Sequence, residues 1–171
     1  MVSMWKSLRQ EGNKRKANAV DKAMVLDDGR NWRNRLNRLV SFPGAKTALR
    51  FMVKTLPPAM LEVAHELQAK GIDSTLAQDK QNHRLRLEIL HGEEVDFVYE
   101  VRLIEGIKPV FALGQAGNLA SAGEQEKYYR AEVFLQDGSQ DYDIVGYTKE
   151  QIIIDILSQY ERHMQFLHLE R

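Results

Sequence analysis

The feature that most constrains the fold is an alternation of apolar and charged side chains on both sides of one short turn. Leu85, Leu87 and Ile89 alternate with arginine and glutamate, and the same period of two returns after His91-Gly92. A period of two places every second side chain on the same face of a strand, so each run predicts a strand with one buried face. Two such runs joined by a tight turn predict an antiparallel hairpin.

Further strands are expected on either side of this hairpin. Residues 72–77 predict a shorter neighbouring strand, and residues 129–135 alternate in the same way. Asp137-Gly138 then turns the chain into a short further strand. Residues 106–125 are rich in Gly and Ala and are expected to form a long loop.

Helices are expected before and after the strands. The first runs through Leu49, Val53 and Leu56 and is interrupted by the proline pair 57–58, because proline lacks the amide hydrogen and disfavours helix in the residue before it. A second helix restarts there and stops at Gly71, a glycine suited to the position after a helix.

The last helix has the clearest signals. Thr148 and Gln151 form a capping-box pattern at its start. One apolar face then continues through Ile153, Leu157, Tyr160, Met164 and Leu167. These elements predict an α+β fold, with a meander-like antiparallel sheet of about five strands covered on one face by helices, including a long C-terminal helix.

The net charge of zero conceals an uneven distribution. Residues 1–46 hold 11 basic and 4 acidic residues, a balance of +7, whereas residues 47–171 hold 13 basic and 20 acidic residues, a balance of −7. A basic arm therefore leads into an acidic body. We expect a basic linker at 1–43 and a soluble α+β domain at 44–171.

The basic linker is expected to contain a short amphipathic helix that Asp28 caps and that ends near Val40. Its apolar stripe either packs on the domain behind it, which we favour, or lies on a membrane surface. Polybasic segments bind anionic lipid or nucleic acid, and the alternative is a solvated tail without a partner. The acidic body disfavours nucleic acid. The candidate contact residues are Lys14, Arg15, Lys16, Arg30, Arg33, Arg35 and Arg38.

The sequence offers no set of residues for catalysis, a metal or a cofactor. The absence of cysteine excludes a thiol nucleophile and cysteine-ligated zinc. His163 and His168 are five residues apart, whereas ligands on one helical face lie three or four apart. The segment 91–94, His-Gly-Glu-Glu, combines an imidazole with carboxylates, but a hairpin turn is the favoured interpretation. The longest uncharged run, residues 109–123, is shorter than the roughly 20 apolar residues of a membrane span.

Three stretches resemble a known family: LVSFP at 39–43, HGEEVDFVYEVR at 91–102, and residues 128–171, whose ending QYERHMQFLHLER is distinctive. They resemble the C-terminal cytoplasmic extension of bacterial high-affinity choline transporters of the betaine/choline/carnitine transporter family. The resemblance runs from Trp32 to the C-terminus.

This resemblance implies a domain attached to the membrane part of the same polypeptide, on the cytoplasmic face of the bacterial inner membrane. The whole protein would import choline for glycine betaine osmoprotection, and the domain would regulate that import. Transporter loops or anionic lipid would then face the basic linker. The alternative is a free-standing cytosolic interaction or small-ligand-binding module of the same fold. Whether the domain self-associates is left open.

Overall fold

The computed structural model describes residues 33, 36–109 and 126–169. The chain divides into two units between Ser41 and Phe42. In the first unit, Arg33 and residues 36–39 are helical, whereas the proposed cap Asp28 lies outside the described residues. Packing of the predicted apolar stripe of this helix on the domain stays a prediction.

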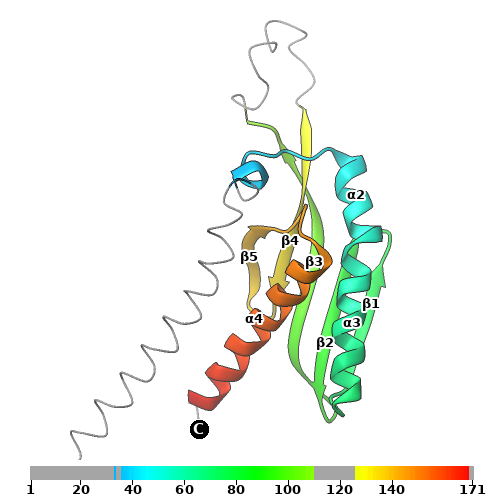
Figure 1. The fold of residues 1–171 in the computed structure, drawn as a ribbon, viewed down its shortest axis with the longest axis vertical. Coiled ribbons are helices and arrows are strands. Elements are labelled where there is room, and N and C mark those ends of the chain that lie inside the picture. Colours follow the sequence, from blue (N-terminus) through cyan, green and yellow to red (C-terminus); the bar gives the residue numbers. More distant parts are fainter. Residues whose placement is uncertain (1–32, 34–35, 110–125, 170–171) are drawn as a thin grey trace, which may run out of the picture. The chain divides into compact units, whose positions relative to one another are not determined.

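The second unit contains a five-stranded antiparallel sheet in the order β1-β2-β3-β4-β5 (Figure 1). Its strands are β1 (Ser74–Asp79), β2 (Arg84–His91), β3 (Glu94–Ile107), β4 (Lys127–Leu135) and β5 (Gly138–Asp143). Each strand pairs with its neighbours in sequence, which makes the sheet a meander. The predicted α+β class is confirmed.

The predicted hairpin is formed by β2 and β3. His91 pairs with Glu94 at its end, and Gly92 between them has a φ of 65°. Glycine adopts this left-handed conformation without the steric cost that a Cβ would bring. The segment 91–94 is therefore a turn, as predicted. The expected loop at 106–125 begins two residues later than predicted because β3 reaches Ile107, and β4 begins only at Lys127; residues 110–125 lie outside the described part.

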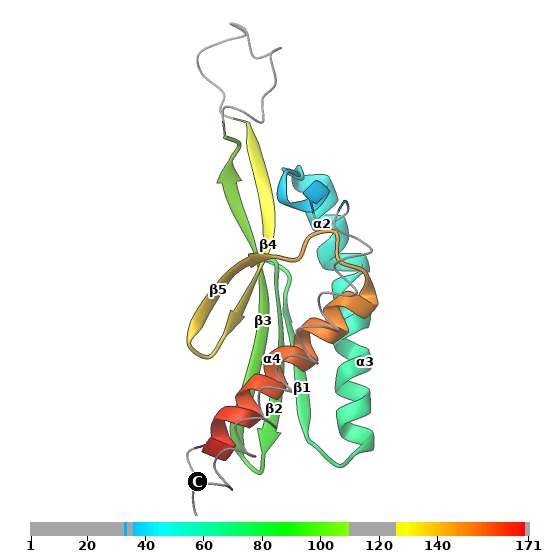
Figure 2. The same cartoon turned by 60° about the vertical axis from the view of Figure 1, so that its left-hand side comes forward.

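Three helices, α2 (Ala45–Lys54), α3 (Leu56–Ala69) and α4 (Lys149–Leu169), cover one face of the sheet (Figure 2). The predicted break at the proline pair is confirmed, since both prolines lie in the first turn of α3. A proline at this point loses no helical hydrogen bond, because the first amides of a helix have no partner within it. Beyond the end of α3, Gly71 has a φ of 76°.

The core lies between these helices and the sheet face formed by odd-numbered residues of β2, β3 and β4. Its sheet side consists of Leu85, Leu87, Ile89, Phe97, Tyr99, Val101, Ala131 and Val133. α3 contributes the face that its spacing predicts, with Met60, Val63, Ala64 and Leu67 buried.

The predicted buried face of α2 is wrong at one position. Ala48, Phe51 and Met52 are buried, whereas Val53 is 59% exposed. The prolines start a separate helix, so α2 and α3 do not share one continuous stripe. α2 packs against α3 and the sheet as a separate helix, and these contacts determine which of its faces is buried.

The buried face of α4 also differs from the predicted one. Ile152, Ile156 and Gln159 are buried, whereas Leu157, predicted to be buried, is 49% exposed. α4 lies against both α3 and β3, and the choice between neighbouring apolar positions depends on that docking angle. The predicted capping box is confirmed: the Thr148 amide donates to Gln151 Oε1 at 3.0 Å, and the Gln151 amide donates to Thr148 Oγ1 at 3.2 Å.

Candidate functional site

Two of the seven predicted contact residues lie in the described part of the chain. Arg33 is exposed and Arg38 is half-buried. The other five lie outside it: Lys14, Arg15, Lys16, Arg30 and Arg35. Contact of these seven residues with lipid or with transporter loops therefore stays a prediction.

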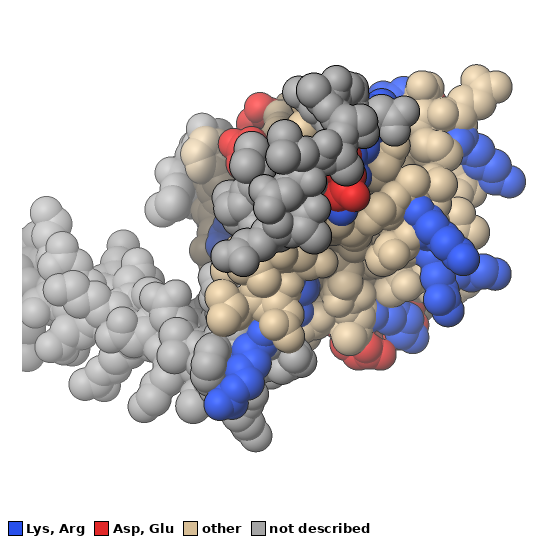
Figure 3. Space-filling model, turned by 90° about the horizontal axis from the view of Figure 1, so that it is seen from above, with Lys and Arg blue, Asp and Glu red and all other residues tan. Residues whose placement is uncertain are grey.

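A further basic stripe, which the sequence reasoning missed, lies on α2. Lys46, Arg50 and Lys54 are four residues apart, so they share one face of the helix, and all three are exposed. None of them forms an ion pair within the described part of the chain, and α2 itself has no acidic residue. Figure 3, a view from above, shows Lys and Arg side chains on the side where α2 lies in Figure 1. Their spacing was the signal that could have revealed this stripe.

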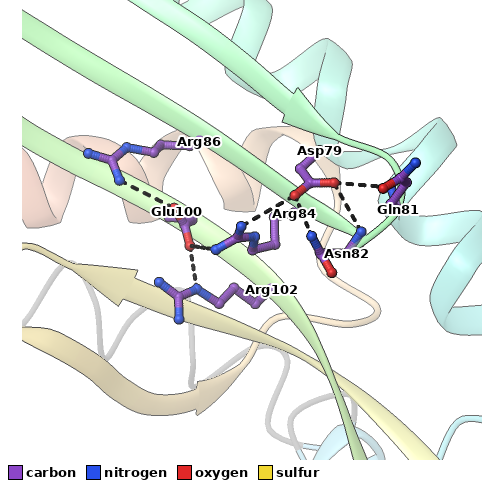
Figure 4. A network of polar contacts seen from close by, with 7 residues as sticks. All are labelled: Asp79, Gln81, Asn82, Arg84, Arg86, Glu100 and Arg102. Atoms are coloured by element: carbon purple, nitrogen blue, oxygen red, sulfur yellow. Dashed lines mark hydrogen bonds and ion pairs between the residues drawn. The ribbon is translucent and has the colours of Figure 1, made fainter.

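The sheet face opposite the helices carries a network of charged side chains (Figure 4). Arg84, Arg86 and Arg102 converge on Glu100, with Arg84 Nη1 at 4.0 Å and Arg86 Nη1 at 3.6 Å from its carboxylate and Arg102 Nε bonded to it directly. The Glu100 side chain is only 6% exposed, whereas the three arginines are 38–42% exposed. The carboxylate is therefore buried beneath guanidinium groups.

This network balances its own charge. Arg86 also pairs with Glu88 at 2.7 Å, and Arg84 pairs with Asp79 at 3.3 Å. On β4, Arg130 pairs with Glu132 at 2.7 Å. Each arginine therefore has a carboxylate partner, and the face offers no surplus of positive charge to an anionic ligand.

This face also holds an apolar side chain, Val98, which is only 6% exposed. Arg102 also lies over the ring of Phe134, 4.1 Å from its centroid, in a cation–π contact. We assign this face a structural role.

Asp79 fixes the turn between β1 and β2. Its carboxylate accepts hydrogen bonds from the amides of Gln81 and Asn82 at 3.1 and 3.0 Å and from the Asn82 side chain at 2.6 Å (Figure 4). The bond from the Asn82 side chain, then that from the Asn82 amide and the contact with Arg84, lower the pKa of Asp79 to about 2. Asp79 is therefore ionised at neutral pH and occupied by its own turn.

A second polar cluster lies between the sheet and α4. Asp155 Oδ2 accepts hydrogen bonds from the hydroxyls of Tyr99 at 2.5 Å and Tyr142 at 2.6 Å, and Gln159 donates to the Tyr142 hydroxyl at 3.0 Å. Tyr99 is fully buried. Burial raises the pKa of Asp155, and the two tyrosine hydroxyls partly oppose that rise. Burial likewise raises the pKa of Tyr99, so both tyrosines remain neutral hydrogen-bond donors.

This cluster joins α4 to β3 and β5. Sequence reasoning missed it, although one signal was available: Asp155 lies next to Ile156 on the inner face of the helix, where a carboxylate needs hydrogen-bond donors. Nearer the end of α4, His163 Nε2 lies 3.1 Å from Asp96 Oδ1. α4 is thus joined to the sheet by polar contacts at two points along its length, and Lys149 at its start pairs with Glu62 of α3 at 2.6 Å.

The described residues contain no group of three His, Cys, Asp or Glu side chains placed to hold a metal ion. The ring of His163 contacts the carboxylate of Asp96, and the side chain of His168 lies outside the described part. Within that part, no helix has the length and hydropathy needed to cross a membrane.

Comparison with known proteins identifies relatives over the whole chain, although no family model matches. The chain is 37% identical to the osmo-dependent choline transporter BetT2 of Acinetobacter baylyi, with 100% of this chain and 25% of that protein aligned. It is 38% identical to the high-affinity choline transport protein of Escherichia coli K12, with 100% and 26% aligned. The chain is homologous to a segment of choline transporters. This homology confirms the resemblance to the betaine/choline/carnitine transporter family.

A glycine betaine transporter of Acinetobacter baylyi also aligns, at 32% identity over 97% of this chain and 25% of that protein. The chain therefore spans about a quarter of the length of the curated relatives it matches. These relatives are transporters rather than enzymes. Homology thus identifies the chain as a transporter-associated domain. The structure shows two charged surfaces on it, the basic stripe of α2 and the neutralised face of the sheet.

Proposed function

We propose that this chain is the cytoplasmic C-terminal domain of a secondary transporter that imports choline for glycine betaine osmoprotection, and that it regulates transport without catalysing a reaction. The observation that carries this proposal is the alignment of the whole chain with a quarter of two choline transporters, one of them described as osmo-dependent.

Regulation requires a surface that senses conditions. We propose that the basic linker, from Lys14 to Arg38, binds anionic lipid or transporter loops at the inner face of the membrane. The exposed stripe of α2, formed by Lys46, Arg50 and Lys54, extends this basic character into the folded domain. Exposed charge contacts weaken as salt rises, since the Debye length is about 8 Å at physiological ionic strength. Rising internal salt would then release the domain and change transport activity.

The association with a transporter is tested first in the source cells. An antibody against this domain is applied to separated membrane and soluble fractions. We expect a single membrane band several times larger than 19.7 kDa, because the chain covers about a quarter of its relatives. A band near 20 kDa in the soluble fraction would favour the free-standing module and refute the transporter assignment.

The regulatory role is tested by choline uptake. Truncation of the transporter at Ser41 is compared with the complete protein across a range of osmolality. We expect the truncated protein to reach the membrane and to lose the dependence of uptake on osmolality. An unchanged osmotic response would show that the domain does not regulate transport.

The lipid contact is tested by sedimentation of the chain with vesicles. We expect binding to anionic vesicles that falls with added salt and that is weakened when Lys14 and Lys16 are both changed to Glu. The control changes Lys70 and Arg162, two exposed basic residues elsewhere, to Glu. Equal binding to neutral and anionic vesicles, or equal loss in both variants, would contradict a specific lipid contact.

A further inference from the structure

The exposed face of α2 carries positive charge that the described part of the chain does not neutralise. Lys46, Arg50 and Lys54, called here the α2 stripe, lie on the side of the helix away from its buried residues. A helix rises about 1.5 Å per residue, so the three cations span about 12 Å. The helix contains no acidic residue. The α2 stripe is therefore a compact run of like charge on one regular element.

Elsewhere on the domain, basic side chains commonly have acidic partners. Among the residues that the structure describes, the following form ion pairs with Asp or Glu: Arg84, Arg86, Arg102, Lys108, Lys127, Arg130 and Lys149. Residues 47–171 have a charge balance of −7, so carboxylates are plentiful on this body. The α2 stripe is a positive strip on an acidic domain, and its charge is left for an anionic partner.

An exposed apolar side chain lies among these cations. Val53 is seven residues after Lys46 and three after Arg50, so it shares their face of the helix, and it is 59% exposed. Basic residues around an exposed apolar group are typical of helices that lie in a membrane interface, where cations meet headgroups and apolar groups reach the acyl boundary. A lipid surface fits both the charge and Val53, whereas an acidic peptide fits the charge alone.

We propose that the α2 stripe docks the folded domain on an anionic lipid surface, with α2 lying along the membrane and Val53 turned toward the headgroups. This proposal rests on the proposed function, which places the domain beside a membrane, and it adds a rigid contact face to the linker at 1–43. It also fixes an orientation. Because α2 lies on the helical side of the sheet, the charged sheet face around Glu100 points away from the lipid (Figure 2).

The strength of this contact follows from the number of cations. A basic residue close to an anionic membrane strengthens binding about fivefold, so three together contribute about a hundredfold. The three side chains are exposed, and charges in water are screened beyond about 8 Å at physiological ionic strength. The contribution of the α2 stripe should therefore fall as salt is added.

The test is sedimentation of the 171-residue chain with vesicles of phosphatidylcholine and phosphatidylglycerol, with phosphatidylcholine alone as the reference. The α2 variant combines Lys46→Gln, Arg50→Gln and Lys54→Gln. Glutamine removes the charge and has nearly the helix propensity of Lys and Arg, so circular dichroism should show a folded chain. We expect this variant to bind the anionic vesicles about a hundredfold more weakly than the unchanged chain. Unchanged binding would refute the proposal.

A matched control separates the α2 stripe from net charge. It changes three exposed cations outside α2 to Gln, namely Lys70, Lys80 and Arg162, and is expected to retain most of its binding. Equal loss in the control and the α2 variant would refute a specific contact. The linker variant, Lys14→Glu with Lys16→Glu, is measured beside them. Loss of binding in the linker variant alone would refute docking by α2 and leave the proposed linker contact standing, and loss in the α2 variant alone would do the reverse.

The orientation is tested with a fluorophore that responds to its surroundings. The chain has no cysteine, so Val53→Cys or Ala77→Cys provides a single site for labelling. Ala77 is exposed and pairs with Arg86, which places it on the charged sheet face. On anionic vesicles we expect the emission at position 53 to shift to shorter wavelength and that at position 77 to stay unchanged. A bound chain whose probe at 53 stays in water would refute lipid docking by α2 and favour an acidic protein surface as the partner of the stripe.

Discussion

Replacing Asp155 with alanine tests how α4 is anchored to the sheet. The substitution removes the acceptor of two hydroxyls, those of the buried Tyr99 and the half-buried Tyr142. Within the described part of the chain, the structure gives the Tyr99 hydroxyl no second acceptor, and Tyr99 is fully buried. A buried donor left without a partner costs about 1–3 kcal/mol. Loss of a buried carboxylate offsets part of this cost, so we expect a net loss of about 2 kcal/mol in the free energy of unfolding.

The double variant, Asp155→Ala with Tyr99→Phe, separates the cost of the orphaned hydroxyl from the loss of the hydrogen bond. Tyr99→Phe alone removes one hydrogen bond and is expected to destabilise the domain by about 1–2 kcal/mol. When it is added to Asp155→Ala, it instead removes the unsatisfied hydroxyl. The double variant should therefore be more stable than Asp155→Ala alone, although Tyr99→Phe is destabilising by itself.

The assay is urea denaturation followed by far-UV circular dichroism at pH 7, with all four proteins of the cycle measured together. The helical signal reports α2, α3 and α4 together, and a common slope of the transition indicates that the compactness of the two states is unchanged. A double variant that is less stable than the unchanged chain by the sum of the two single effects, and therefore less stable than Asp155→Ala, would refute the idea that the orphaned hydroxyl carries the cost.

Three further predictions follow from particular contacts. Asp155→Asn tests the pH dependence: because burial raises the folded-state pKa of Asp155 above its ordinary value of 3.8, the folded state binds the proton more tightly. The contribution of Asp155 to the free energy of unfolding should therefore be greatest below pH 3.8 and should fall as the pH rises from 3.8 through the raised pKa. Measured against the Asn variant, the stability of the unchanged chain should fall over this pH range and be constant above it. Thr148→Ala should lower the free energy of unfolding by about 1 kcal/mol through loss of the capping box, whereas Thr148→Ser, which keeps the hydroxyl, should have a smaller effect. Gly106→Ala would place a Cβ 2.6 Å from the ring of Tyr128 and should cost about 1–3 kcal/mol in thermal or urea unfolding, and Tyr128→Ala in the same chain should relieve part of that cost.

The strands and the hairpin could be predicted because they depend on local pattern. Leu85, Leu87 and Ile89 have to face one side of any strand that contains them, and a glycine turn between two such runs leaves few alternatives to a hairpin. The capping box of α4 is equally local, since its two residues lie one turn apart. These features hold in the structure as the sequence predicts.

The inner faces of α2 and α4 could not be predicted reliably. Val53 and Leu157 have the right spacing and hydrophobicity for burial, yet both are exposed. Each helix has more apolar positions than one face can bury, and the docking angle against the sheet decides which are covered. That angle depends on contacts between segments far apart in the sequence.

The candidate surfaces likewise fall into those that the sequence determines and those that only the tertiary structure forms. The charge asymmetry, the basic linker and the resemblance to a transporter family are properties of the sequence order, and they need no coordinates. The burial of Glu100 under three arginines and the attachment of Asp155 to Tyr99 and Tyr142 arise only when five strands and a helix assemble. The sequence alone determined the class of fold and the family, because local periodicity and residue identity are written along the chain. Only the tertiary structure decided which charges are neutralised and which basic side chains of the described part stay unpaired, because both depend on distances between residues that the chain order does not bring together.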